Sequence, residues 1–222
     1  MIRIILFIML ISCTAMENQQ KEKIVFFGDS ITEQGMLPKG YITLMKDKIS
    51  QKKLDDKYEL DGAGIGGNKV YDLYLRMDDD VLPKNPSTVV IWIGVNDVWH
   101  KKSFGTGTDP DKFERFYNAI IKRLKNNNIR VVLCTPAVIG EKTDLNNSQG
   151  LDTDLDNYAG IIRNIAKNNN CSLIDLRKAF LDFNKANNKD NKETGILTND
   201  GVHLNDSGNE LVADEMMKAL VK

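Results

Sequence analysis

Four short segments of this chain combine nucleophilic, basic and small residues, and they lie far apart in the sequence. They are Gly28-Asp29-Ser30, Gly64-Ile65-Gly66-Gly67-Asn68, Gly94-Val95-Asn96-Asp97 and Asp200-Gly201-Val202-His203. The first three each follow a short run typical of a strand, and ligands bind beyond the carboxyl ends of strands in open α/β sheets. The fourth precedes the last helical pattern and can reach the same place. We therefore expect the four segments to meet at one edge of a sheet.

Ser30 and His203 are residue types of nucleophilic catalysis. A serine hydroxyl is a poor nucleophile until a base takes its proton, and histidine titrates near neutral pH. Asp200 precedes His203 by three residues in a glycine-containing turn, where it can hold the imidazole tautomer and stabilise the imidazolium. The three residues predict a catalytic triad, with Ser30 as nucleophile and His203 as general base.

Acyl transfer through a serine also needs donors for the oxyanion of its tetrahedral intermediate. The backbone N–H groups of Ser30 and Gly67 and the side-chain amide of Asn96 can supply three. Gly67 suits this role because a residue without Cβ lets the backbone approach a ligand closely.

The elements that must position these groups alternate along the chain. Apolar and β-branched runs predict strands over Ile24–Phe27, Tyr58–Leu60, Thr88–Ile93, Val131–Cys134 and Ser172–Asp175. Between them, apolar residues at helical spacing from Phe113 to Leu124 follow Asp109-Pro110, which predicts an N-cap and an N1 proline. Ser207-x-x-Glu210 predicts the capping box of the last helix. Strand–helix alternation without a repeat or linker predicts one α/β domain, a three-layer α/β/α sandwich.

These four blocks, in this order, resemble those of the SGNH hydrolases, also called GDSL esterases or lipases. The blocks of that family centre on Ser, Gly, Asn and His, here Ser30, Gly67, Asn96 and His203. The resemblance covers a domain over residues 23–222. It implies a five-stranded parallel, flavodoxin-like sheet, a Ser-His-Asp triad and a three-donor oxyanion hole, with no metal and no organic cofactor. Ile31 follows the serine at the position where the founding motif has Leu. Ile at this position is common among relatives.

Each of these residues also has an ordinary structural explanation. Ser30 is a type that often caps helices, His203 could lie on the surface, and Asn96 could be a turn residue. Asp29 and Asp97 are expected to tie loop backbone together rather than to react.

Two residues just past the asparagine block are candidate substrate contacts. Trp99 could stack on a sugar ring or simply pack at the edge of the site. His100 is expected to be a loop side chain that could touch substrate.

The first 22 residues read as a signal peptide and a short tether. Arg3 is followed by an apolar run from Ile4 to Ile11, which is too short to span a bilayer but suits a secretory signal. Leu10-Ile11-Ser12-Cys13 resembles the lipobox of bacterial lipoproteins, which implies lipidation of Cys13. The expected location is an exported, membrane-anchored lipoprotein of the cell envelope, or alternatively a secreted protein.

Other site classes are disfavoured. The formal net charge is −1, from 30 Lys and Arg against 31 Asp and Glu, so no basic excess indicates nucleic acid, and membrane contact is expected only through the lipid anchor. Gly62-x-Gly64-x-x-Gly67 matches a dinucleotide fingerprint but lacks the following acidic residue. Asp152-x-Asp154-x-Asp156 fails as a calcium loop and is expected to be the solvated start of a helix. Cys134 and Cys171 are expected to be buried free thiols.

The expected partner is a small-molecule or glycan ester. The connecting segments Lys101–Asp109 and Glu141–Gly150 are polar, so a small acyl group such as acetyl on a sugar fits better than a long lipid tail. The alternatives are a lysophospholipase or thioesterase of the same family, or a non-catalytic glycan-binding module on the same fold.

Overall fold

The computed structural model describes residues 21–143 and 150–222, and within them five parallel strands form one sheet in the order β2-β1-β3-β4-β5. The strands are β1 (Glu22–Gly28), β2 (Tyr58–Gly64), β3 (Thr88–Trp92), β4 (Arg130–Cys134) and β5 (Ser172–Ile174). All five occur where the sequence predicts strands, and β1 and β2 are each longer than predicted. The apolar runs of β1 and β3 are buried along most of their length, as expected when helices cover both faces.

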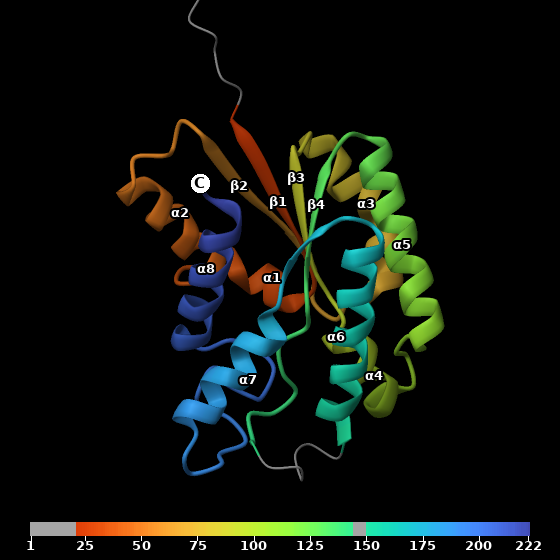
Figure 1. Ribbon diagram of the computed structural model, residues 1–222, viewed down its shortest axis with the longest axis vertical. Coiled ribbons are helices and arrows are strands. Elements are labelled where there is room, and N and C mark those ends of the chain that lie inside the picture. The colour runs from red at the N-terminus through yellow and green to blue at the C-terminus, as the bar shows by residue number, and fades with distance from the viewer. Residues whose placement is uncertain (1–20, 144–149) are drawn as a thin grey trace, which may run out of the picture.

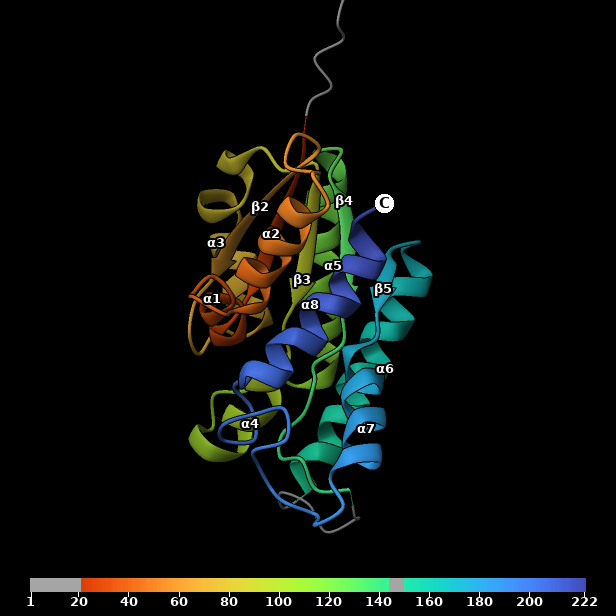
Figure 2. The same ribbon diagram turned by 90° about the vertical axis from the view of Figure 1, so that its left-hand side faces the viewer.

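Helices cover both faces of the sheet, which gives the predicted three-layer sandwich (Figure 1). One face carries α1 (Ser30–Gly35), α2 (Tyr41–Gln51) and α8 (Asp206–Leu220). The other carries α3 (Val70–Asp80), α5 (Pro110–Asn126) and α6 (Leu151–Asn168). Helices α4 (Val95–Phe104) and α7 (Leu176–Asn187) lie toward the carboxyl ends of the strands (Figure 2), and a short 3₁₀ helix, Leu82–Lys84, precedes β3.

The carboxyl ends of the strands are level. Gly28 of β1 is paired with both Gly64 and Trp92, Trp92 is paired with Cys134, and Cys134 is paired with Ile174. The chain leaves β1 toward β2 on one side, and from β3 it proceeds to β4 and β5 on the other. The reversal between β1 and β3 is the point where ligands bind in doubly wound sheets, and it has the flavodoxin-like order.

The glycine-rich pattern that imitates a dinucleotide fingerprint lies partly inside β2. A Cβ on Gly64 would come within 2.1 Å of the backbone nitrogen of Glu33 and 2.7 Å of the carbonyl oxygen of Asp29. The missing side chain at Gly64 therefore lets α1 pack directly on the end of β2. Close helix packing accounts for this glycine without a nucleotide.

Local sequence signals account for the start of α5 and for the turns that end α5 and α6. Helix α5 begins at Pro110 after Asp109, and it buries Phe113 and Tyr117. Asn128 and Asn170, just past the ends of α5 and α6, have φ of 60° and 50°, the left-handed conformation that terminates helices and that asparagine tolerates.

The capping box predicted at Ser207 is wrong. Helix α8 begins at Asp206, two residues earlier than that box implies, and Asn205 is its N-cap: the Asn205 side chain accepts a hydrogen bond of 3.0 Å from the backbone nitrogen of Gly208. Asn is as strong a cap as Ser, and here it lies at the position from which its oxygen reaches the first turn.

Cys134 and Cys171 are free. Cys134 is fully buried, whereas Cys171 is only partly buried, so the expectation holds in full for one of them. Cys134 is level with Ile174, three residues beyond Cys171. This offset along neighbouring strands explains why the two thiols are unbridged.

Asp152 is buried, not solvated as predicted. Helix α6 does begin at Leu151, but Arg177 of α7 reaches Asp152 with two hydrogen bonds of 2.6 Å and Asp156 with one of 2.8 Å. Arg177 is 1% exposed and Asp152 6%. A further Arg177 bond to the carbonyl of Ala137 ties the segment after β4 to this pair. The carboxylate at the helix start is therefore half of a buried ion pair.

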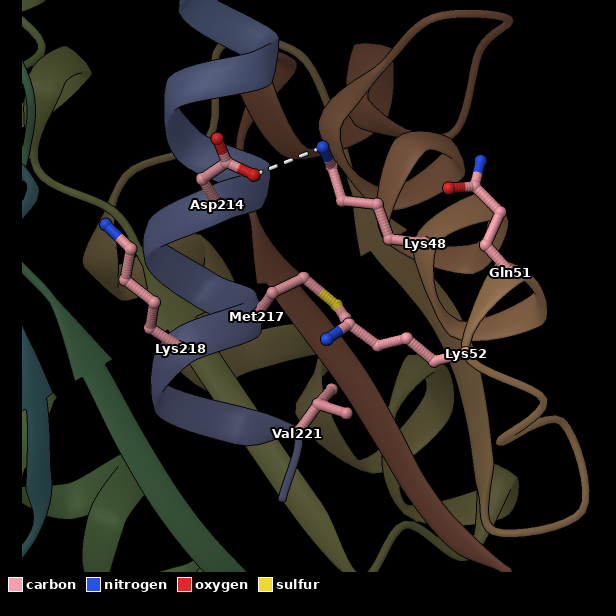
Figure 3. Close-up of a pocket in the computed structure, with 7 residues that line it drawn as sticks. All are labelled: Lys48, Gln51, Lys52, Asp214, Met217, Lys218 and Val221. Atoms are coloured by element: carbon pink, nitrogen blue, oxygen red, sulfur yellow. Dashed lines mark ion pairs between the residues drawn. The ribbon is translucent and has the colours of Figure 1, made fainter.

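A groove of about 600 Å³ lies between α2 and α8, lined by Lys48, Gln51, Lys52, Asp214, Met217, Lys218 and Val221 (Figure 3). Lys48 pairs with Asp214 across it. Next to Val221, the backbone nitrogen of Lys222 donates to the hydroxyl of Tyr58, the first residue of β2. The groove is therefore near the amino ends of the strands, away from Ser30.

The predicted signal peptide and Cys13 lie outside the described residues, as does the part of the Glu141–Gly150 segment from 144 to 149. Within the described part of the chain, no helix combines the length and apolarity needed to cross a bilayer.

The buried ion pair predicts a large stability loss on losing one partner. Asp152→Asn should lower the free energy of unfolding by about 3 kcal/mol, because Arg177 remains buried without its main counter-charge. Asp182→Asn breaks the exposed pair of Asp182 with Lys178 and should cost less than about 1 kcal/mol. Urea denaturation measures both, and equal losses would contradict this assignment.

Candidate active site

Ser30 lies at the turn between β1 and α1. The hydrogen bond that caps α1 comes from Asp29, whose carboxylate accepts from the backbone nitrogen of Ile31 at 3.0 Å. Capping is thus performed by the residue before the serine, and the Ser30 hydroxyl points elsewhere. As the first residue of the helix, Ser30 also has a backbone N–H without an intrahelical partner.

The Ser30 hydroxyl contacts His203, 173 residues further along the chain. Its Oγ lies 3.0 Å from His203 Nε2, and Asp200 Oδ2 lies 2.7 Å from His203 Nδ1. The other Asp200 oxygen accepts from the backbone nitrogens of His203 and Val202, at 2.8 and 3.0 Å. The structure therefore brings together all three residues of the predicted triad, in the order a triad requires.

The electrostatics of Asp200 suit its place. Partial burial would raise the pKa of Asp200, but hydrogen bonds from the His203 ring and from two backbone nitrogens outweigh it and hold the pKa below the usual value. Asp200 is thus ionised beside the imidazole at neutral pH.

The three predicted oxyanion donors follow β1, β2 and β3. Gly67 has φ of +76°, a conformation favourable to glycine, and a Cβ on its neighbour Gly66 would lie 3.8 Å from the Cβ of Ser30. Asn96 is buried, and its amide nitrogen donates to the carbonyl of Asn68 at 3.1 Å. An amide has two N–H groups, so this bond orients Asn96 and leaves its second N–H for another acceptor.

Two cations that the sequence analysis missed support this arrangement. Arg76 of α3 donates to the carbonyls of Gly28 and Ala63, at 2.8 and 2.9 Å, and to the side chain of Asn68 at 2.6 Å. Lys69 donates to the carbonyl of Gly67 at 3.0 Å. They connect the ends of β1 and β2 with the Gly67 segment. A lone Arg or Lys in an amphipathic pattern reads as a solvent-facing residue, so no local signal marks them.

Asp29 and Asp97 tie backbone together, as predicted. Asp97 accepts from the backbone nitrogen of Val70 with both oxygens, at 3.2 and 3.3 Å. Burial raises the pKa of Asp29 to about 7, against the opposing effects of the Ile31 hydrogen bond and of His203. Burial likewise raises the pKa of Asp97 to about 7.

Trp99 and His100 lie in α4 and not in a loop, because the helix continues to Phe104. Trp99 is partly buried against the core. A Cβ on Gly67 would lie 3.8 Å from His100 Cε1, so His100 borders the oxyanion segment. Burial, and then the charge of Lys69, lower the pKa of His100. Substrate contact by either residue stays a prediction.

The raised pKa of Asp29 predicts a pH-dependent stability. The unfolded chain releases this proton near pH ~4, whereas the folded protein holds it until about pH 7. Between those values folding takes up a proton, so this group's stabilising contribution is lost as pH rises, by up to about 1.4 kcal/mol per pH unit.

Asp29→Asn removes the titration while its amide oxygen can still cap Ile31. The free energy of unfolding in urea should therefore fall less steeply from pH 4 to pH 7 in the variant than in the wild type. Asp97 and the other carboxyls titrate in both proteins, so the slope is reduced and not abolished. Parallel curves would show that Asp29 does not hold its proton.

Comparison with known proteins places these features in a family. Residues 26–211 match the model of the GDSL-like Lipase/Acylhydrolase family. A crystal structure of an acetyl xylan esterase, AlAXEase, superposes with a TM-score of 0.87 at 61% identity and covers 90% of this chain and 100% of its own.

More distant relatives cover a similar extent. The acetylxylan esterase of Geobacillus stearothermophilus is 25% identical over 90% of this chain and 94% of its own length. The uncharacterized lipoprotein YqeF of Bacillus subtilis strain 168 is 25% identical over 94% and 93%. Since the family model spans most of the chain and the carboxyl edge of its sheet carries the Ser30–His203 contact, this protein belongs to the GDSL-like lipase/acylhydrolase family and is a carboxylic-ester hydrolase.

Proposed function

We propose that this protein removes acetyl groups from a carbohydrate by a Ser-His-Asp acyl-enzyme mechanism. The observation that carries the mechanism is the unbroken contact from Ser30 Oγ through His203 to Asp200, at 3.0 and 2.7 Å. Side chains this far apart in the sequence rarely meet in such an order without a chemical role.

In the acylation step, Ser30 Oγ attacks the ester carbonyl while His203 Nε2 takes its proton. The electron pair of the carbonyl moves onto its oxygen, where the N–H groups of Ser30, Gly67 and Asn96 stabilise the negative charge. Asp200 stabilises the imidazolium. The intermediate then collapses, the sugar oxygen leaves with the proton from His203, and the acetyl group stays on Ser30.

In the deacylation step, water takes the place of the alcohol. His203 removes a proton from the water as it attacks the acetyl carbonyl, and the same three donors hold the second oxyanion. Collapse returns the proton to Ser30 Oγ and releases acetate. One water is consumed for each ester bond broken.

The substrate class rests on the polar character of the site and on its relatives. A Cβ on Gly66 would lie only 3.8 Å from the Cβ of Ser30, and residues 105–109 beyond α4 include no large apolar residue, which favours a small acyl group. Two of the relatives, AlAXEase and the Geobacillus stearothermophilus enzyme, are named acetylxylan esterases. Acetyl on a xylan-like glycan is therefore the favoured substrate, with Trp99 and His100 as candidate sugar contacts.

Export is the second part of this proposal. The apolar run from Ile4 to Ile11 and the lipobox ending in Cys13 support a lipoprotein, and one relative is named as a lipoprotein. We infer that lipidated Cys13 anchors the enzyme to a membrane.

A substrate panel tests the activity. We expect turnover of acetylated xylo-oligosaccharide and p-nitrophenyl acetate, little of p-nitrophenyl octanoate, a thioester or a lysophospholipid, and covalent labelling by a fluorophosphonate. Ser30→Ala should abolish turnover and labelling without altering the circular dichroism spectrum. Preference for the lysophospholipid or thioester would establish one of those activities instead. Absence of labelling and turnover would leave a glycan-binding module.

The oxyanion role of Asn96 predicts a kinetic signature. Asn96→Ala should lower kcat on p-nitrophenyl acetate by about 10²–10³-fold, because a donor to the developing charge is lost. Steady-state kinetics separates this from ground-state binding, in which only KM would rise. A change in KM alone would remove Asn96 from the oxyanion hole.

The anchor is tested by fractionation. Wild-type protein should enter the detergent phase of a membrane extract, since the several chains of a lipoprotein bind firmly, and Cys13→Ser should be released or left unprocessed. Soluble wild-type protein would indicate an ordinary secretory signal.

A further inference from the structure

The turn that carries Asp200 and His203 belongs to residues 188–205, a long segment between α7 and α8. This segment contains no helix and no strand. Loops of this length lack a ladder of their own and depend on contacts with the rest of the protein. The Ser30–His203 and His203–Asp200 contacts, at 3.0 and 2.7 Å, are nevertheless within hydrogen-bond distance. Something outside the segment must hold it in place.

Glu141, beyond the end of β4, makes contacts of the required kind. Its side chain has no exposed surface, and its carboxylate accepts from three consecutive backbone nitrogens of that segment. One oxygen accepts from Leu197 at 2.5 Å and Thr198 at 2.8 Å, and the other from Ile196 at 2.8 Å. Among the described residues it has no Lys, Arg or His partner, so backbone N–H groups stabilise this carboxylate.

The backbone around Glu141 holds the same segment at other points. Glu141 donates to the carbonyl of Glu193 at 2.9 Å and accepts from the side chain of Asn188 at 2.8 Å. Its neighbour Gly140 donates to the carbonyl of Gly201 at 2.8 Å. Residues 140 and 141 therefore hold both the chain that leads into the turn and the turn itself, at Gly201.

A short path joins the Glu141 carboxylate to the triad. Thr198, one of its donors, forms an isolated antiparallel bridge with Leu204, and its hydroxyl accepts from the backbone nitrogen of Gly201 at 3.1 Å. Asn199 donates to the carbonyl of His203 at 2.8 Å. Asp200 and His203 thus lie within a small closed turn, and Glu141 binds the backbone at the start of that turn.

From these contacts we propose that Glu141 is a positioning residue, which fixes the Asp200–His203 turn so that the imidazole lies between Asp200 and Ser30. The inference rests on the proposed mechanism. Misplacement of reacting groups by about 1 Å can cost about 100-fold in rate, so a buried carboxylate that touches no substrate still affects kcat.

Glu141→Gln is the central variant. The substitution preserves the side-chain volume. It replaces one carboxylate oxygen, which accepts a hydrogen bond, by an amide N–H₂ group, which cannot accept one from the backbone N–H group that it faces. On p-nitrophenyl acetate we expect kcat to fall about 10-fold or more, with KM within about 2-fold, because only the alignment of the acid–base group changes. Asp175→Asn, at the start of α7, is the matched control. It removes a half-buried carboxylate bound to Arg163 and should lower Tm with kcat unchanged.

A double-mutant cycle with Asp200→Asn separates positioning from general loosening. If Glu141 acts through the Asp200–His203 contact, Glu141→Gln should change kcat by less than about 3-fold once Asp200 is already replaced. If the fold losses in kcat of the two single variants multiply in the double variant, the proposal is overturned. Wild-type kcat in Glu141→Gln while Asp200→Asn is impaired would also overturn it. An unimpaired Asp200→Asn enzyme would instead overturn the triad itself.

A spectroscopic readout and a second variant guard against misfolding. The proton NMR signal of the His203 Nδ1–H group, bonded to Asp200, should move or broaden in Glu141→Gln while the core methyl signals stay in place. If Glu141→Gln does not fold, Thr198→Val keeps shape and removes the acceptor for Gly201, and the same coupling with Asp200→Asn is expected. Independent losses in that cycle, or an unchanged Nδ1–H signal, would refute the positioning role.

Discussion

The level carboxyl ends of the strands are the constraint on which the rest of the site depends. Because Gly28, Gly64 and Trp92 are paired across three neighbouring strands, the segments that follow them start side by side. The positions of Ser30, the Gly67 segment and the Asn96 segment are therefore set by backbone register before any side chain contributes. A slip of one residue in β1 would turn its side chains to the opposite face and move Ser30 away from both donors.

Buried and partly buried polar side chains then hold in place the segments that the strand register brings together. Asp29 caps α1, Asp97 holds the start of α3, and Arg76 connects the carbonyls at the ends of β1 and β2. Each satisfies backbone groups that would otherwise be buried without partners, which is costly. Much of the polar interior of this protein lies around one site, consistent with preorganisation of the reacting groups.

The sequence predicted the fold class, the strands and the triad residues because their signals are local. Apolar runs, the turn before His203 and the residue types at Ser30 and Asn96 can be read within a few positions. Asp152, Glu141 and Arg76 could not be understood in this way, since each is a charged residue whose partners lie on other elements. The capping box at Ser207 was wrong because two capping residues lay two positions apart, and local rules rank them equally.

The direction of β1 has a consequence for an enzyme held at a surface. The strand begins at Glu22 at one edge of the sheet and delivers Ser30 at the other, roughly 25 Å away at about 3.3 Å per residue. In the anchored enzyme that we propose, a tether attached ahead of Glu22 joins the body on the side remote from Ser30. The end of the sheet that carries Ser30 would then face the surrounding medium, and an insoluble or polymeric substrate could approach it without meeting the membrane.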